Sequence, residues 1–494
     1  MKKKILMVYP RYDETFWSFK KVLKIINKES AFPPLGLLTV SAMLPADWEK
    51  KILDLNFENL TEQDILWADY VFISAMIVQK LSSDQVIQKV QQLGKPVVAG
   101  GPLFTTGWEN YTHVDHLFIG ESEHTIKDFI EDVRQDKVKD RYECDSFPDI
   151  ETSPIPDWEQ IDITKYNSLC IQFSRGCPFN CEFCDIVKLN GRVPRTKSSQ
   201  QIIDELDTIY AKGYRGGIFF VDDNFIGNKG KLKREHLPAI IQWQKQRKYP
   251  FAFNTQVSIN LADDQELMQL MSDAGFTAVF VGIETPDPAG LAECSKYQNQ
   301  NRDLIESVQT LQKAGFEVQG GFIVGFDSDT PSIFQSQIDF IQKSGIVTAM
   351  VGVLTALPKT RLYQRLKETK RLIGDTAANN TNTLSLNFVP KMGKQALIDG
   401  YQKIVENIYS PQQYYERIKI FITNYKTPHR GLQKLRIYHI KAFFASLWLL
   451  GIKDKGRRYF WKLMAWSLFK HPTKLPYAIG FSLTGIHFRS VFTY

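Results

Sequence analysis

The 494-residue sequence predicts an α/β fold, in two consecutive α/β units followed by a helical region. Three observations lead to this prediction. Short apolar runs alternate with helix-spaced patterns over the first 140 residues, the alternation resumes on a longer spacing up to about residue 372, and strand patterns almost disappear after Gly374. Domains are therefore expected at 1–140, 166–373 and 374–494, with a polar, proline-bearing linker at 141–165.

The first unit contains five strand candidates bounded by proline, glycine and polar residues. They read KILMVYP, KKILDLNF, YVFISAM, KPVVAGG and HLFIGE, with helix-spaced segments between them. This alternation predicts a doubly wound, Rossmann-like parallel sheet, whose ligand would lie above the carboxyl ends of the strands. Small residues at those ends would let a large flat ligand approach the backbone. The motif G-x-G-x-x-G does not follow the first strand, so nicotinamide binding is disfavoured.

The second unit contains six strand candidates, from LCIQFS to AMVGVLTAL, each followed by a helical pattern. Several of these helical patterns close on glycine, as helices often do. Six strand–helix pairs predict an incomplete (β/α)6 barrel, with the chemistry in loops at the carboxyl ends of its strands. Three clustered cysteines follow the first of these strands directly.

The cysteines lie in the stretch SRGCPFNCEFCDI, at Cys177, Cys181 and Cys184. A zinc site needs four ligands, whereas only Cys181 and Cys184 have pair spacing and no histidine lies within 50 residues on either side. Iron–sulfur clusters are held by cysteine thiolates, normally four. Three thiolates would leave one iron open to a substrate or cofactor. Six cysteines in so long a chain make no disulfide framework and suit a reducing cytoplasm.

The spacing C-x3-C-x2-C, with Phe183 before the last cysteine, resembles the radical S-adenosylmethionine (SAM) superfamily. The resemblance implies a [4Fe–4S] cluster on the three cysteines, with SAM on the open iron. Further motifs follow in order: FFVDDNF, VGIET, GGFIVG and TALPKTRLYQRL, the last with Lys359 where glycine is usual. They imply SAM contacts from Asp222, Asp223, Asn224, Glu284, Gly321 and Gly325. The alternative for the acids and amide is a solvated turn or helix cap, and for Glu284 a surface acid.

The first unit resembles the cobalamin-binding domain of the class B branch of this superfamily. The matching pieces are FPPLGLLTVSAML, GGP and GESE. With SAMIVQK, which ends the third strand, they imply cobalamin contacts from Pro34, Gly36, Ser74, Gly100, Gly101, Gly120 and Glu121. The signature D-x-H-x-x-G is missing, so no histidine ligand to cobalt is expected. The methylthiotransferase branch carries three further cysteines in its N-terminal domain, whereas this chain has none before Cys144.

The C-terminal region, together with DDNFIGNK, resembles the subgroup that includes hopanoid 2-methyltransferases. This resemblance implies transfer of methyl from methylcobalamin to an unactivated carbon of a small molecule or lipid, with a hopanoid-like lipid as one candidate. The electron would come from a donor such as flavodoxin or ferredoxin. A cobalamin-dependent rearrangement or cyclisation without methylation would carry the same motifs. A protein that binds a cluster without turnover is a third hypothesis, for which a set of SAM motifs would have no role.

Basic residues are concentrated at the C-terminus. Residues 426–494 contain 13 Lys and Arg against one acid, Asp454, so the rest of this chain of net charge +7 is acidic. Nucleic-acid binding by the whole protein is therefore not expected. Two apolar runs, Ala442–Ile452 and Tyr459–Phe469, are too short to span a bilayer. They would either pack as a helical cap on the next domain or lie on an anionic membrane surface. The expected location is cytoplasmic, with membrane association through this region.

Overall fold

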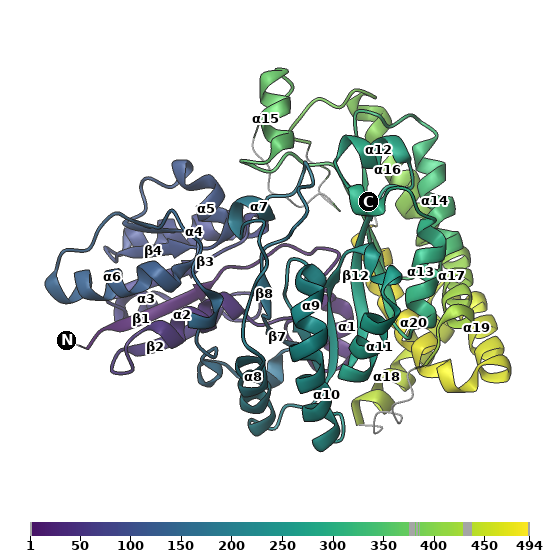
Figure 1. Cartoon of the computed structure of the whole chain (residues 1–494), viewed down its shortest axis with the longest axis horizontal. Coiled ribbons are helices and arrows are strands. Elements are labelled where there is room, and N and C mark those ends of the chain that lie inside the picture. Colours follow the sequence, from purple (N-terminus) through teal and green to yellow (C-terminus); the bar gives the residue numbers. More distant parts are fainter. Residues whose placement is uncertain (1, 375–380, 382–383, 385, 428–436, 493–494) are drawn as a thin grey trace.

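The computed structural model describes residues 2–374, 381, 384, 386–427 and 437–492. Its two parallel sheets lie side by side, and the helices from residue 394 onward pack on the second sheet, on the side away from the first (Figure 1). This arrangement confirms the predicted fold class of two α/β units and a helical region. The polar stretch at 375–383 and the basic residues at 428–436 lie largely or wholly outside the described residues.

The first sheet is entirely parallel, in the order β2-β1-β3-β4-β5-β6. Its strands are β1 (Lys4–Tyr9), β2 (Glu49–Asp54), β3 (Tyr70–Ser74), β4 (Val97–Gly100), β5 (His116–Ile119) and β6 (Arg141–Glu143). Its helices are α1 (Lys20–Ile25), α2 (Leu35–Met43), α3 (Glu62–Trp67), α4 (Lys80–Gln92), α5 (Pro102–Gly107) and α6 (Ser122–Gln135). The strand order reverses between β1 and β3, and ligands of such sheets bind beyond the carboxyl ends at this switch point.

The strand β6 corrects the predicted boundary at residue 141. We expected the linker to begin there, but Arg141–Glu143 pairs with β5 as the edge of the first sheet. Only Tyr142 of these three residues is buried. One buried residue between two charged ones makes no apolar run, which is why the pattern did not predict this strand.

The second sheet is also entirely parallel, in the order β14-β13-β12-β11-β10-β7. Its strands are β7 (Ser168–Ile171), β10 (Gly217–Phe220), β11 (Ala252–Val257), β12 (Phe276–Glu284), β13 (Glu317–Val324) and β14 (Ala349–Val353). The helices that follow them are α7 (Ile186–Leu189), α8 (Ser199–Ala211), α9 (Lys229–Lys231), α10 (Leu237–Gln246), α11 (Gln265–Ala274), α12 (Pro288–Glu293), α13 (Leu304–Lys313) and α14 (Ile333–Ser344). Each strand pairs with the next one along the chain, and β7 and β14 end the sheet, as the incomplete barrel requires.

The C-terminal region is helical, as predicted. It comprises α15 (Arg361–Glu368), α16 (Lys394–Ile408), α17 (Pro411–Asn424), α18 (Ile437–Trp448), α19 (Arg457–Lys470) and α20 (Leu475–Val491). The helices α16 and α17 pack against α14, and the Tyr409 hydroxyl donates to the carbonyl of Ala349 in β14 at 2.7 Å. Among the described helices, none has both the length and the apolar character needed to cross a membrane.

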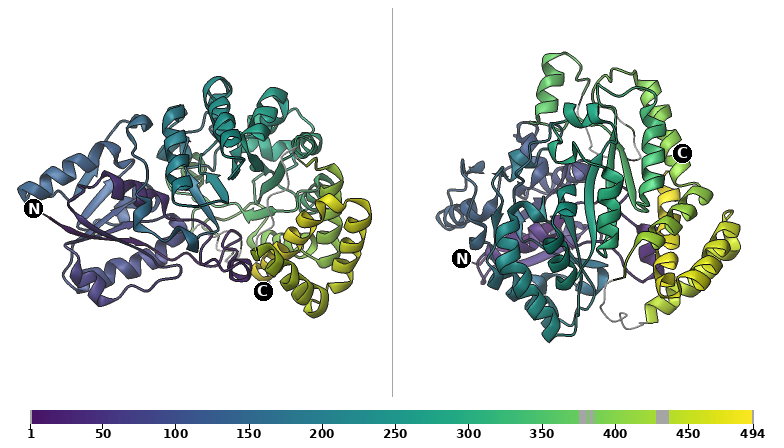
Figure 2. Two further views of the ribbon diagram at one scale, coloured as in Figure 1. Left: turned by 90° about the horizontal axis from the view of Figure 1, so that it is seen from below. Right: turned by 45° about the vertical axis from the view of Figure 1, so that its right-hand side comes forward.

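The segment after β1 joins the N-terminal unit to the far end of the chain. Phe16 stacks on Phe488 of α20 with ring centroids 4.5 Å apart, and α1 lies beside α20 (Figure 2). The indole nitrogen of Trp17 donates to the sulfur of Met350 in β14 at 3.1 Å. Residues 16 and 17 therefore contact both the helical region and the open edge of the second sheet.

Candidate active site

The cysteine loop begins directly after the first strand of the second sheet. Its base is a short antiparallel pair, β8 (Ser174–Arg175) with β9 (Arg195–Thr196). Gly176 has a φ of 100°, and a Cβ atom there would lie 2.8 Å from the carbonyl oxygen of Val193. Only glycine avoids this clash, so the residue before Cys177 is determined by the loop's closure. The Cys177 amide then donates to the carbonyl of Gly191 at 3.1 Å.

The loop presents three free thiols to one region of the barrel mouth. Cys181 is buried, and Cys177 and Cys184 are half-buried. Burial raises the pKa of the Cys177 and Cys184 thiols, and the neighbouring Lys296 ammonium opposes this rise. Within the described ranges, no three His, Cys, Asp or Glu side chains converge as a single-ion site would require. A [4Fe–4S] cluster binds each thiolate at a separate iron, so three spaced thiols fit it better than a lone zinc ion.

The predicted SAM residues Asp222, Asp223 and Asn224 follow β10, and in this structure the two aspartates bind the cysteine loop. Asp222 is fully buried and accepts from the Ser174 hydroxyl at 2.6 Å and from its amide. Burial raises the pKa of Asp222 to about 7. Asp223 accepts from the Gly176 amide at 2.8 Å. This burial excludes a solvated turn for Asp222. A contact of any of the three with SAM stays a prediction.

Asn224 continues this set of contacts to the next strand. Its amide nitrogen donates to the Ser258 hydroxyl at 3.2 Å, and its carbonyl oxygen accepts from the Ser258 amide at 3.2 Å. Ser258 follows β11 directly. The end of β10 is thus tied both to the cysteine loop and to the end of β11.

Glu284 ends β12 with a φ of 65°, beside an irregularity in the pairing with β13. Its carboxylate is buried and accepts from the Lys296 ammonium at 2.8 Å. Burial by itself lowers the pKa of Lys296, but Glu284 and the thiols of Cys181 and Cys184 raise it. A Cβ atom on Gly282 would lie 2.3 Å from the Glu284 carboxylate, so this ion pair depends on a glycine beneath it. Glu284 is therefore not a surface acid, and its contact with the SAM ribose stays a prediction.

The sequence did not point to Lys296, which follows Glu284 by twelve residues across α12. Its neighbour Gln298 donates to the Cys181 sulfur at 3.9 Å, and Glu182 donates its amide to the Cys294 carbonyl at 2.9 Å. The segment 294–298 therefore lies against the cysteine loop. A single basic residue in a polar turn makes no sequence pattern, so the position of Lys296 beside Glu284 and the cysteine loop could not be predicted.

The glycines of the GGFIVG motif permit close packing. A Cβ atom on Gly321 would lie 2.7 Å from the ring of Phe280, and one on Gly325 would lie 3.0 Å from Leu397 of α16. Gly325 has a φ of 111°, and its amide donates to the Asp329 carboxylate at 2.7 Å. These contacts explain why small residues occur here. A role for Gly321 and Gly325 at the adenine of SAM stays a prediction.

Lys359 occupies the position where the resembling motif has glycine. Its φ is 64°, a left-handed conformation that costs a non-glycine residue energy. Its ammonium lies 3.1 Å from Glu109 of the N-terminal unit. The backbone conformation of the motif is thus kept despite the substitution, and the lysine adds a contact between the two units.

Three predicted cobalamin residues meet at the carboxyl edge of the first sheet. The Ser74 hydroxyl lies where Cβ atoms on Gly36 and Gly101 would approach it, at 3.7 and 3.0 Å. Gly101 has a φ of 93°, so a side chain there would be strained as well as crowded. Gly36 is exposed, so this small-residue edge is open to solvent. Such an edge fits a large planar ligand that approaches the backbone.

The other predicted cobalamin residues lie around this edge. Pro34 is buried and is the N-cap of α2, and a Cβ atom on Gly100 would lie 3.3 Å from Phe118. Gly120 has a φ of 88° and donates its amide to the Thr105 hydroxyl at 3.1 Å. A Cβ atom there would meet open space. Direct contact of all seven residues with cobalamin stays a prediction.

Glu121 instead joins the two units. Its carboxylate binds Arg175 at 2.5 Å and Arg195 at 2.5 Å, which are the β8 and β9 residues at the base of the cysteine loop. Arg175 also binds Glu123 at 2.8 Å. All four side chains are largely buried. The arginines were not predicted, although Arg175 stands two residues before Cys177.

Three family models match the chain, in the order that the fold suggests. They are a B12 binding domain at residues 23–130, the radical SAM superfamily at 171–341 and a domain of unknown function at 360–494. The chain is thus an enzyme of the radical SAM superfamily that carries a cobalamin-binding domain. Its cofactors are a [4Fe–4S] cluster, SAM and cobalamin.

Relatives place the chain within this class. It is 38% identical to an uncharacterized methyltransferase of Synechocystis sp., over 94% of this chain and 87% of the relative. It is 34% identical to the hopanoid C-2 methylase of Rhodopseudomonas palustris, over 93% of this chain and 88% of the relative. The chain therefore belongs to this family of cobalamin-dependent radical SAM methyltransferases. The solved structure of the cobalamin-dependent SAM radical enzyme OxsB has the same fold, with a TM-score of 0.64 over 96% of this chain and 80% of that chain at 16% identity.

Proposed function

We propose that this methyltransferase acts on an unactivated carbon of a large apolar molecule, a hopanoid-like lipid. The observation that carries the proposal is a group of aromatic and apolar residues on the inner face of the second sheet, which also carries the polar Asn254, Gln256 and Gln319. Along β10 to β14, residues that face the helices are buried, and many of the alternate residues are half-exposed. Such alternation means that the inner face remains accessible from solvent.

Aromatic and apolar residues line part of this inner face. Phe219, Phe280 and Met350 are half-exposed on three different strands. The N-terminal unit adds two rings: Phe32 lies 5.3 Å from Phe219, and Trp17 lies 5.6 Å from Phe280, centroid to centroid. An apolar surface between the two units suits an apolar methyl acceptor. The hopanoid C-2 methylase, at 34% identity, supports the same class of acceptor.

The roles proposed for the chain's own residues follow from their positions. Cys177, Cys181 and Cys184 would hold the cluster, and the small-residue edge at Ser74 and Gly101 would hold cobalamin. When bound, these cofactors supply the radical chemistry and the methyl group that side chains cannot provide. Asp222 and Asp223 would keep the cysteine loop in place, and the buried Glu284–Lys296 pair would line the cluster side of the site.

The test is a reconstitution under anaerobic conditions, with a hopanoid in detergent as the probe. Iron, sulfide and corrinoid are quantified first, and S-adenosylhomocysteine and a hopanoid heavier by one methyl group are then measured. Both products should form in the wild-type enzyme and neither in Cys181→Ala. A consumed hopanoid without S-adenosylhomocysteine would instead favour the rearrangement or cyclisation. Trp17→Ala should raise KM for the hopanoid with little change in iron content.

We also propose that the enzyme is cytoplasmic, receives its electron from a flavodoxin or ferredoxin, and touches an anionic membrane surface through α18, α19 and the turn between them. Several large apolar side chains are exposed there: Phe444, Trp448, Ile452, Trp461, Leu468 and Phe469, the last 84% exposed. The exposed charges beside them are basic, at Lys453, Lys455, Arg457, Arg458, Lys462 and Lys470. The acid in this segment, Asp454, is paired with Arg489 at 2.9 Å.

The two faces of α19 bear on the helical-cap alternative and on the proposed membrane contact. Phe460, Leu463 and Met464 are buried against the neighbouring helices, whereas Trp461 and Phe469 face outward. A helix with a packed inner face and an aromatic, basic outer face suits an interfacial position. Flotation with vesicles containing anionic lipid should recover the wild-type protein and lose Trp461→Ser/Phe469→Ser. Equal recovery with neutral vesicles would contradict the electrostatic part of the proposal.

A further inference from the structure

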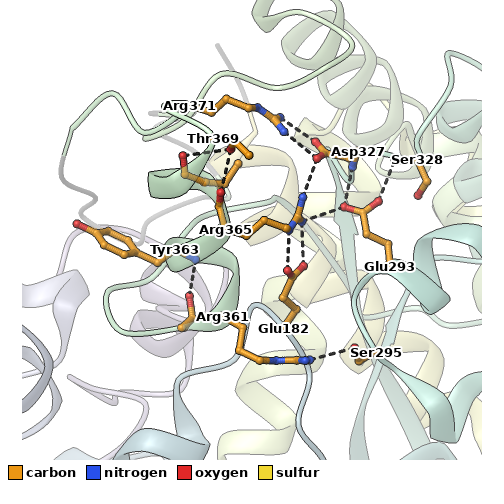
Figure 3. A network of polar contacts seen from close by, with 12 residues as sticks. Glu182, Glu293, Ser295, Asp327, Ser328, Arg361, Tyr363, Arg365, Thr369 and Arg371 are labelled. Atoms are coloured by element: carbon orange, nitrogen blue, oxygen red, sulfur yellow. Dashed lines mark hydrogen bonds and ion pairs between the residues drawn. The ribbon is translucent and has the colours of Figure 1, made fainter.

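The helix α15, at the start of the domain of unknown function, lies directly against the cysteine loop. The Arg361 guanidinium donates to the Asn180 carbonyl at 2.7 Å, and the Leu362 amide donates to the Glu182 carbonyl at 3.0 Å. The Arg365 guanidinium donates to both carboxylate oxygens of Glu182, at 2.7 and 2.9 Å (Figure 3). The residues on both sides of Cys181 are therefore bound by one helix.

The same loop is also bound by the segment after α12. The Glu182 amide donates to the Cys294 carbonyl at 2.9 Å, and Arg361 also donates to the Ser295 hydroxyl at 3.0 Å. The neighbours of Cys181, Asn180 and Glu182, are thus bound through their backbone by α15, and Glu182 also by the segment after α12. Neither contact comes from the strand that precedes the loop.

Arg365 is the centre of a larger ionic network. It binds Asp327 at 2.7 Å and Glu293 at 3.2 Å, and Arg371 binds both oxygens of Asp327 at 2.7 Å (Figure 3). Burial raises the pKa of Asp327, but hydrogen bonds from Arg371 and Arg365 outweigh it and lower this pKa to about 2. Glu293 accepts the backbone amides of Asp327 and Ser328 at 2.9 and 2.8 Å. The network therefore connects the loops after β12 and β13 to the cysteine loop.

We propose that Arg365 is a positioning residue for the iron–sulfur cluster, and that holding the cysteine loop is a role of the domain of unknown function. The inference rests on the proposed function in one respect, that Cys177, Cys181 and Cys184 hold the cluster. Of the two intervals in the motif, the one between Cys181 and Cys184 contains Glu182, whose side chain is 13% exposed. The Arg365 fork fixes this residue and, through it, the spacing of two thiols.

The planar fork is essential to this role. Arginine can bind both oxygens of Glu182 and still reach Asp327, because its donors are arranged in a rigid plane. Lysine would keep the positive charge, but its single ammonium group lacks the planar fork that matches the two Glu182 oxygens. Loss of the cation would leave three carboxylates, at 182, 293 and 327, with repulsion between them and fewer partners.

The experiment compares Arg365→Gln, Arg365→Lys, Glu182→Gln and the double variant Arg365→Gln/Glu182→Gln with Lys367→Gln. Lys367 is an exposed cation on the same helix, so its variant matches the change in charge. After reconstitution, iron release to a chelator and the electron paramagnetic resonance spectrum of the reduced cluster are measured, with and without SAM. Circular dichroism checks the fold.

We expect iron affinity to fall by about 10- to 100-fold in Arg365→Gln, as for other residues that orient metal ligands. Arg365→Lys should fold, with an iron affinity between those of Arg365→Gln and the wild type. Both Arg365 variants should alter the electron paramagnetic resonance spectrum. The double variant should lose no more iron affinity than Arg365→Gln alone, because Arg365→Gln already removes the contact with Glu182. Equal iron retention in Arg365→Gln and Lys367→Gln, additive losses, or an unchanged spectrum in Arg365→Lys would overturn the proposal. A wild-type protein without a cluster would overturn the proposed function first.

Discussion

The carboxyl edges of the two parallel sheets are built in opposite ways. At the first edge, Gly36, Ser74 and Gly101 keep side chains away from the backbone. At the second edge, buried and half-buried charges bind one another around the cysteine loop, as in Glu284 with Lys296 and Glu182 with Arg365. A large planar cofactor needs a surface without projections, whereas a cluster needs three thiols at fixed positions. From this difference we expect the first site to depend on the shape of its surface and the second on ion pairs and hydrogen bonds.

We expect the largest effect from a substitution of Cys181, a proposed cluster ligand at the second edge. Cys181→Ala removes one of three thiolates, so we expect no stable cluster and no methylated product. The corrinoid content should be unchanged, because the first edge does not depend on this thiol. Iron, sulfide and corrinoid analysis of the purified variant measures both. A variant that loses corrinoid together with iron would show that the two edges are not independent.

Glu121 belongs to the first unit but binds at the second edge, so its variant tests the connection between them. Glu121→Gln leaves Arg195 without its carboxylate partner and Arg175 with Glu123 as its remaining carboxylate partner. We expect the free energy of unfolding to fall by about 3 kcal/mol, as when a buried ion pair is broken. Urea unfolding measures this loss. Glu131→Gln is the control, because its pair with Arg134 on α6 is exposed at both ends and should change stability by under about 1 kcal/mol.

The first edge is tested by adding one methyl group. In Gly101→Ala, the new Cβ atom would lie 3.0 Å from the Ala75 carbonyl at a φ of 93°. We expect about 2 kcal/mol lower stability, from conformational strain and overpacking, together with weaker corrinoid retention. Gly94→Ala is a matched control, since Gly94 also has positive φ but nothing lies near its Cβ position. Comparable corrinoid loss in both variants would contradict a shape-determined edge.

The smallest effect concerns Lys359, at the margin between the two units. Glycine would relieve the left-handed strain of about 1 kcal/mol, and loss of the half-exposed pair with Glu109 would cost a similar or smaller amount. Lys359→Gly should therefore shift the free energy of unfolding by less than about 1 kcal/mol in either direction. Thermal unfolding measures the shift. A loss of several kcal/mol would mean that Lys359 holds the two units together.

Local patterns predicted the elements that carry the cofactors, because strands, helices and short motifs are encoded by nearby residues. The five apolar runs of the first sheet and the six of the second are present as strands, and Cys177, Cys181 and Cys184 share one loop. The sequence did not predict β6, because a single buried tyrosine makes no alternating apolar pattern. Contacts between residues far apart in the sequence were not predicted for a different reason. Arg365 lies 183 residues from Glu182, and no local pattern relates them.

The sequence by itself determined the two α/β units, the helical region, the cluster motif and the class of chemistry. The tertiary structure decided what surrounds the motif. Asp222 and Asp223 accept hydrogen bonds from the cysteine loop, and Lys296 pairs with Glu284. The helix α15 binds the residues beside Cys181. The physical reason is that a motif specifies which atoms can bind iron. Only the packing of distant segments, through desolvated charges and glycine-sized gaps, determines where those atoms are held.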